Sequence, residues 1–231
     1  PSNIFYTNSA SPQPMQAIML EEIEQHELNL IINPGHPQTT TYHYCGWTAS
    51  VILGLEYALL CDYDILIYVE QDCLLYGDDI SKIIKHSLKK YGLSLGNGDG
   101  TPQFIQQSLF AIHKTRFRNF LCALHNINFS DREVSPEDKF HLAACKQPSR
   151  YFLSKVVWLE QQLKIKRYSF VRKVITALKY FLFRSTRKYD FLPFGYGRSR
   201  PINFNDDTFY FQHASEEELK KFADLIGSAN V

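Results

Sequence analysis

The chain has 231 residues, of which 45% are hydrophobic and 21% are charged, which is ordinary for a folded protein. Its five cysteines include no CxxC pair, which argues against a zinc ribbon and a disulfide framework and favours a reducing compartment. No stretch of about 18 apolar residues occurs, so the sequence predicts no transmembrane helix. The first residues do not resemble a signal peptide, and we therefore expect a cytoplasmic protein.

The charges are segregated along the chain, although the formal net charge is only +1. Residues 1–138 contain 8 Lys and Arg against 16 Asp and Glu, a net charge of −8. Residues 139–200 contain 15 against 2, a net charge of +13, and residues 201–231 contain 2 against 6, a net charge of −4. A basic block of this density usually faces an anionic partner, or it forms solvated helix faces.

The first third of the chain alternates between strand and helix patterns. Helix 14–26 has apolar residues at helical spacing, whereas 64–69 is a nearly continuous apolar run, typical of a strand buried on both faces. This alternation predicts a Rossmann-like α/β fold with a mixed, mainly parallel sheet flanked by helices. The expected elements are strands at 3–7, 28–32 and 64–69, and helices at 14–26 and 46–60.

The remainder continues the α/β pattern and then becomes basic and helical. Ser135 is a predicted N-cap, because Pro136 stands at the favoured first helical position. We expect an α/β core over 1–146, and over 147–231 a basic helical appendage whose C-terminal strand and helix complete the same domain. The expected elements are helices at 79–91, 114–125, 136–144, 158–187 and 215–226, strands at 106–113 and 208–212, and a flexible glycine-rich loop at 96–100.

The sharpest candidate site follows the apolar strand 64–69. Glu70, Gln71 and Asp72 stand at its carboxyl end, where ligands bind in open parallel sheets. Two carboxylates at positions i and i+2 can share a hard divalent cation, directly or through water. Such a cation would neutralise a diphosphate as its bond breaks. The alternative is a pair of surface acids that close a strand.

At this point the chain resembles the GT-A glycosyltransferases, most closely the inverting family 2. In that family a helix of small residues precedes an apolar strand that ends in a DxD-type motif, and here this order runs from Gly46 through Asp64 to Asp72. The resemblance covers about residues 3–146 and a short C-terminal element. It implies Mn²⁺ or Mg²⁺ as cofactor, held by Asp72 and Glu70, and a UDP- or GDP-sugar as donor.

Two more segments match this family. The segment Ser135–Phe140 resembles its xED motif, in which one acid is the general base on the acceptor hydroxyl. This resemblance favours Asp138 as the base, with Glu137 next; the plain alternative is an acidic first helical turn. A C-terminal histidine often completes the metal site in this class, which makes His213 a candidate ligand.

The resemblance also implies a nucleotide-sugar site and an acceptor site. The expected donor contacts are Thr7, Asn8, Ser9, Asn33, Gly46 and Gln71. The expected acceptor or loop contacts are Trp47, which is equally suited to the core, and Tyr196, Arg198 and Arg200 from a glycine-containing loop whose arginines can bind a diphosphate bidentately.

Segment 168–187 is amphipathic and basic. Its apolar stripe comprises Val171, Val174, Ile175, Leu178, Phe181 and Leu182. Such a helix either packs its stripe on the core or lies in the plane of an anionic membrane. The sequence therefore leaves open a peripheral membrane contact.

The sequence as a whole predicts a metal-dependent hexosyl- or pentosyltransferase, most simply an inverting one, that acts on a glycan or a lipid-linked glycan. A nucleotidyltransferase of similar architecture is one alternative, but the glycine-rich basic loop expected after its first strand is missing. A nucleic-acid-binding protein that uses the +13 segment is the other. We expect no nucleic acid partner, because no RRM, KH or zinc-finger pattern occurs.

Overall fold

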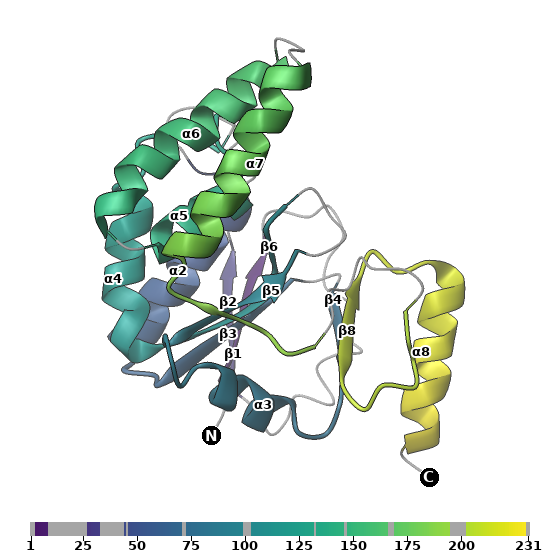
Figure 1. The fold of residues 1–231 in the computed structure, drawn as a ribbon. Coiled ribbons are helices and arrows are strands. Elements are labelled where there is room, and N and C mark those ends of the chain that lie inside the picture. Colours follow the sequence, from purple (N-terminus) through teal and green to yellow (C-terminus); the bar gives the residue numbers. More distant parts are fainter. Residues whose placement is uncertain are drawn as a thin grey trace.

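The computed structural model describes residues 3–8, 27–32, 44, 46–70, 73–98, 103–131, 133–145, 147–165, 169–194 and 202–229, with β1 and β2 described by their backbone alone. Within these ranges the fold is mixed α/β, with seven helices and a four-stranded mixed sheet (Figure 1). The strands are β1 (Asn3–Asn8), β2 (Glu27–Ile32), β3 (Ile65–Val69), β4 (Cys73–Tyr76), β5 (Leu93–Asn97), β6 (Ile105–His113), β7 (Asp190–Phe191) and β8 (Phe209–Gln212). The helices are α2 (Gly46–Leu60), α3 (Ile80–Ser87), α4 (Lys114–His125), α5 (Pro136–Ala144), α6 (Gln147–Ile165), α7 (Ser169–Thr186) and α8 (Glu216–Ala229).

The central sheet has the strand order β3-β6-β5-β7. β6 is antiparallel to both β3 and β5, so β3 and β5 run in the same direction, and β7 is parallel to β5. Two of its three pairings are therefore antiparallel, and the expectation of a mainly parallel sheet is not confirmed for this sheet. β1 and β2 do pair in parallel, from Asn3 opposite Glu27 to Asn8 opposite Ile32.

The main core lies between the central sheet and helices α2, α4 and α5 (Figure 1). Its aromatic centre is Phe140, whose ring contacts those of Phe110 on β6 and Phe120 on α4 at centroid distances of 5.3 and 5.0 Å. The expectation that β3 is buried on both faces is wrong for the described residues, because Ile67 and Val69 are each 42% exposed. A run of apolar residues does not reveal which face neighbouring elements cover.

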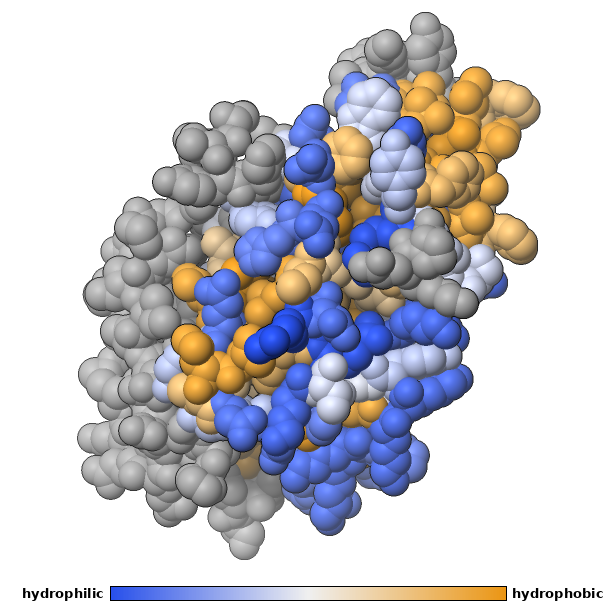
Figure 2. Space-filling view, turned by 90° about the vertical axis from the view of Figure 1, so that its left-hand side faces the viewer, coloured by the Kyte–Doolittle hydropathy of each residue, from blue (hydrophilic) through white to orange (hydrophobic). Residues whose placement is uncertain are grey.

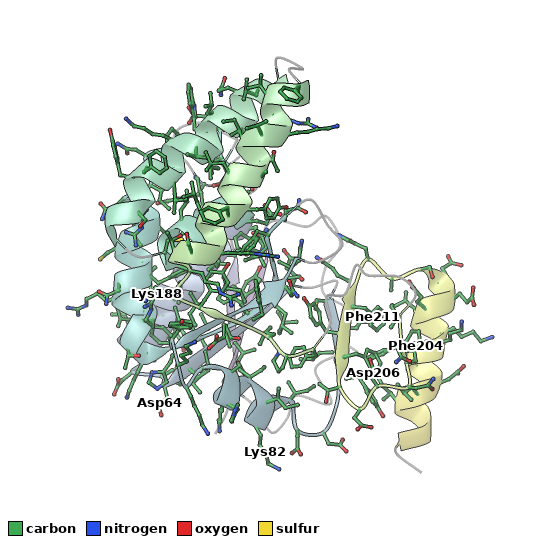
Figure 3. The ribbon with its side chains drawn as sticks, in the orientation of Figure 1. Asp64, Lys82, Lys188, Phe204, Asp206 and Phe211 are labelled. Atoms are coloured by element: carbon green, nitrogen blue, oxygen red, sulfur yellow. The ribbon has the colours of Figure 1, made fainter. Side chains whose placement is uncertain are left out.

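A second, smaller layer forms at the C-terminal end. β4 and β8 pair as an antiparallel two-stranded sheet, and α8 packs beside it (Figure 1). Phe204 and Phe211 lie between β8 and α8 (Figure 3), with ring centroids 5.8 Å apart. β4 was not expected from the sequence, because four residues are too few to show a period.

The basic segment folds into two long antiparallel helices, α6 and α7, which pack against each other and project from the core (Figure 1). We call this pair the α6–α7 hairpin. The helical segment expected at 158–187 corresponds to α7 and the second part of α6, which begins earlier, at Gln147. Helix α3 likewise ends at Ser87 rather than at Tyr91, and Gly96, expected in a flexible loop, lies in β5.

Glycines at the end of β5 are required by close packing. A Cβ atom on Gly96 would lie 2.9 Å from the carbonyl oxygen of Gln106, and one on Gly98 would lie 2.1 Å from that of Gln103. Backbone atoms of neighbouring residues therefore leave no room for a side chain at these two glycine positions.

Candidate functional site

The backbone of Glu70 is held directly beyond β3. Its N–H donates to the carbonyl of Ser108 on β6 at 2.8 Å, and its own carbonyl accepts from the N–H of Cys73 at 3.0 Å. The first bond extends the pairing of β3 with β6, and the second leads the chain into β4. The backbone position of Glu70 is therefore fixed by the sheet.

The pairing of β4 with β8 brings a distant segment to this carboxylate. Cys73 lies opposite Gln212 in the antiparallel register. Gln212, which is buried, donates from Nε2 to Oε2 of Glu70, although the two residues are 142 positions apart. His213 follows immediately, exposed and with a left-handed φ of 55°, a conformation that non-glycine residues seldom adopt and that often marks functional positions. Gln212 thus brings the segment that contains His213 to the Glu70 carboxylate.

These residues have the chemistry of a divalent-cation site. Carboxylate oxygens suit Mg²⁺ or Mn²⁺, and an imidazole suits the softer transition ions. The buried side chain of Gln212 holds the Glu70 carboxylate toward β8, the strand that His213 follows. Within the described ranges no three His, Cys, Asp or Glu side chains are grouped for a metal ion, and Asp72 and Gln71 lie outside those ranges.

The predicted acidic helix start is confirmed in its local structure. Ser135 caps α5 by accepting a hydrogen bond from the N–H of Asp138 at 3.2 Å, and Pro136 occupies the first turn. The two acids differ in environment: Glu137 is half-buried, whereas Asp138 is only 6% exposed. The same helical turn therefore presents one accessible and one inaccessible carboxylate.

Asp138 belongs to a buried ion-pair cluster that joins three helices. Lys179 of α7 lies 3.3 Å from Oδ1 of Asp138 and 2.6 Å from Oε2 of Glu160 on α6. Burial raises the pKa of Asp138, and the nearby Glu160 carboxylate adds to this, against the opposing attraction of Lys179. Burial acts to lower the pKa of Lys179, but attraction by the two carboxylates outweighs it and raises that pKa. The cluster fixes the start of α5 against the α6–α7 hairpin.

His141 lies one turn beyond Asp138 in an entirely buried position. Its ring stacks on Phe183 at 3.5 Å between centroids, and its Nδ1 lies 2.7 Å from the hydroxyl of Tyr189. Burial, with the charges of Lys179 and Arg187, lowers the pKa of His141 well below its ordinary value. His141 is therefore neutral at physiological pH.

Trp47 is half-buried and packs against the main core. Its ring contacts Tyr68 on β3 at 5.7 Å and Phe140 on α5 at 4.7 Å between centroids. Tyr68 stands two residues before Glu70, and Phe140 stands two residues after Asp138. Trp47 therefore connects the end of β3 to the start of α5, the two segments on which the sequence places metal binding and proton transfer.

The other predicted site residues are only partly described. Gly46 is the buried first residue of α2, and Thr7 and Asn8 lie at the end of β1, described by their backbone. Ser9, Asn33, Tyr196, Arg198 and Arg200 lie outside the described residues.

One pocket of about 430 Å³ lies apart from these positions, between α4, α5 and the first turns of α6. Three cations line it, Arg116, Arg150 and Lys188, and none of its lining residues is acidic or is a predicted site residue. Arg150 donates from Nε to the carbonyl of Leu142 at 2.9 Å. This arginine thereby satisfies the C-terminal end of α5, which gives part of the pocket a structural role.

Sequence reasoning missed Lys179 and Glu160. Each is a single charged residue in an amphipathic helix, and in the sequence such a residue looks the same whether it is buried or exposed to solvent. The sole signal was Glu160 itself, the only acid between positions 139 and 189.

No family model matches the chain, and searches of curated proteins and of solved structures found no match. No helix in the described ranges is long and apolar enough to cross a membrane.

Proposed function

We propose that this protein is a metal-dependent glycosyltransferase of the GT-A type, which transfers a sugar from a nucleoside diphosphate sugar to an acceptor hydroxyl. The observation that carries the proposal is the contact of Gln212 with Glu70. The resemblance to this class makes Glu70 and His213 candidate ligands of one ion, and the β4–β8 pairing makes their segments neighbours. The parallel β1–β2 pair and the common direction of β3 and β5 are compatible with this fold.

In this proposal Glu70, Asp72 and His213 hold Mn²⁺ or Mg²⁺. The ion supplies charge neutralisation for the diphosphate leaving group. Gln212 is a positioning residue, because its amide keeps the Glu70 carboxylate in one orientation toward β8. The end of β1, with Thr7 and Asn8, is the proposed contact for the nucleotide.

We assign the proton-accepting role to Glu137 rather than to Asp138. A general base must come within hydrogen-bond reach of the acceptor hydroxyl, and Asp138 is buried and paired with Lys179. Glu137 is half-buried in the same first turn. Asp138 then acts as a positioning residue that anchors this turn to α7.

Nucleotide binding tests the metal site. We would titrate the protein with UDP, GDP, dTDP and CMP, each with and without Mn²⁺, by calorimetry. One nucleotide should bind only with Mn²⁺, and Glu70→Gln, Asp72→Ala and His213→Ala should each weaken that binding about tenfold or more. Glu56→Gln and His86→Ala, at exposed positions elsewhere, are the matched controls. Metal-dependent binding that all three site variants retain would refute the assignment.

Turnover of the donor sugar tests the base. Glu137→Gln should lower kcat by a factor of about 100 to 10,000 while the KM for the donor and the unfolding midpoint stay near wild type. Asp138→Asn, unlike Glu137→Gln, should change the unfolding midpoint in addition to kcat. Full activity in Glu137→Gln would contradict this role, and release of pyrophosphate from a nucleoside triphosphate would instead favour a nucleotidyltransferase.

A further inference from the structure

The α6–α7 hairpin exposes many large apolar side chains. Phe170 and Phe181 on α7 are 77% and 69% exposed, and Tyr151 and Phe152 on α6 are 71% and 56% exposed. Hydrophobic residues gather over the hairpin at the upper right of Figure 2. The exposed large apolar residues are Tyr151, Phe152, Trp158 and Leu159 on α6 and Phe170, Val171, Val174, Leu178 and Phe181 on α7. We call these nine residues the apolar face of the hairpin.

The apolar face cannot turn inward, because the opposite side of α7 is anchored in the core. Phe170, Val174, Leu178 and Phe181 follow one another at helical spacing and form a single stripe. Lys179 and Phe183 lie on the other side of the helix. Lys179 forms ion pairs with Asp138 and Glu160. The ring of Phe183 stacks on that of His141. The sequence left open whether this stripe packs on the core, and its most exposed members do not.

The charges around the apolar face have one sign. Lys155, Lys173 and Arg184 are exposed, and Arg172 is half-buried. Glu160 is the only acid in α6 and α7, and it points inward to Lys179. The sequence adds Lys164 near the end of α6, and Lys166 and Arg167 directly after it. The hairpin thus combines an exposed apolar surface with unopposed positive charge.

We propose that the apolar face of the α6–α7 hairpin docks on an anionic lipid surface. Aromatic and aliphatic side chains of an amphipathic helix enter the boundary between headgroups and acyl chains, and the flanking cations attract anionic headgroups. A nucleic acid would use the cations but leave the aliphatic stripe exposed. A second copy of the chain would bring two basic surfaces together. This inference goes beyond the proposed transferase and needs neither metal nor nucleotide.

Vesicle co-sedimentation tests the proposal at low ionic strength and without nucleotide or metal. The protein should bind vesicles of equimolar phosphatidylcholine and phosphatidylglycerol, and should not bind phosphatidylcholine alone. The double variant Phe170→Ser/Phe181→Ser should lose at least about tenfold in affinity. Lys173→Glu/Arg184→Glu should also lose about tenfold or more, because each cation near an anionic surface contributes about fivefold. Added salt should weaken wild-type binding.

Matched controls separate this surface from general effects. Leu60→Ser/Leu219→Ser removes exposed apolar residues from α2 and α8, and Lys89→Glu/Lys220→Glu makes the same change of net charge elsewhere. Both controls should bind vesicles as wild type does, and all variants should keep the wild-type unfolding midpoint. The proposal is overturned if the wild type binds neither vesicle, or if the phenylalanine variant binds as well as wild type. A concentration-dependent dimer that only the phenylalanine variant abolishes, without lipid binding, would make this face a contact between copies.

Discussion

Gln212 donates a hydrogen bond to the carboxylate of Glu70, joining the residue that ends β8 to the residue that follows β3. The bond depends on the antiparallel register in which Cys73 lies opposite Gln212. A shift of one residue would turn the Gln212 side chain to the other face of the strand. The β4–β8 pairing therefore decides whether the segment before His213 reaches Glu70.

Gln212→Glu tests this relationship through stability. A second carboxylate beside Glu70 should destabilise the protein by about 1–3 kcal/mol at neutral pH, because two like charges come together out of water. A divalent cation bound there should relieve the repulsion, so Mn²⁺ should raise the unfolding midpoint of the variant more than that of wild type. Gln161→Glu on α6 is the control, and equal Mn²⁺ effects in all three proteins would count against a cation site.

Lys179→Met should be strongly destabilising. It removes the cation that lies between the buried carboxylates of Asp138 and Glu160 and leaves two uncompensated acids. Breaking a buried pair in this way costs about 3–5 kcal/mol of unfolding free energy, measurable by urea titration. Lys173→Met, on the exposed side of the same helix, should stay within about 0.5 kcal/mol of wild type. A loss below about 1 kcal/mol for Lys179→Met would show that the cluster does not hold the hairpin.

His141 should make the protein less stable as the pH falls below its ordinary pKa of 6.5. The folded state keeps this buried imidazole neutral, while the unfolded chain takes up a proton below that pH. The unfolding free energy should therefore fall by about 1.4 kcal/mol per pH unit below 6.5 for this group and be unaffected by it above.

His141→Asn should reduce that slope in thermal or urea unfolding measured between neutral and mildly acidic pH. The variant also loses the contact with Tyr189, so the slope and not the absolute stability is the readout. His86→Asn, at an exposed position on α3, should keep the wild-type slope. An unchanged slope in His141→Asn would assign the acid sensitivity to other groups.

Replacing two glycines by alanine should change the stability of the protein in opposite directions. Gly54 lies within α2 with no atom within 4 Å of a Cβ built there, so Gly54→Ala should stabilise the protein by about 0.5–1 kcal/mol. A Cβ on Gly98 would lie 2.1 Å from the carbonyl oxygen of Gln103, so Gly98→Ala should destabilise by about 1–3 kcal/mol. Unfolding midpoints measure both, and effects of the same sign would contradict the packing at one of the two positions.

The amino-acid sequence alone determined the local elements that carry strong periodic or capping signals. α2 and α4 have the expected bounds, and α5 begins after its predicted Ser135 cap, because periodicity and N-cap chemistry act over a few neighbouring residues. The sequence also indicated the basic amphipathic character of α7. These features depend on side chains within one or two helical turns of each other.

Only the tertiary structure decided which distant segments meet and which side of a helix stays exposed. The antiparallel pairings of β6, the contact of Gln212 with Glu70 and the burial of Asp138 between α6 and α7 join residues far apart in the chain. Helical spacing places Lys179 and Phe181 on different sides of α7, but it does not say which side faces the core. Packing decided this, because the ion pairs of Lys179 and the ring stack of Phe183 on His141 fix one side of the helix inside and leave the apolar stripe outside.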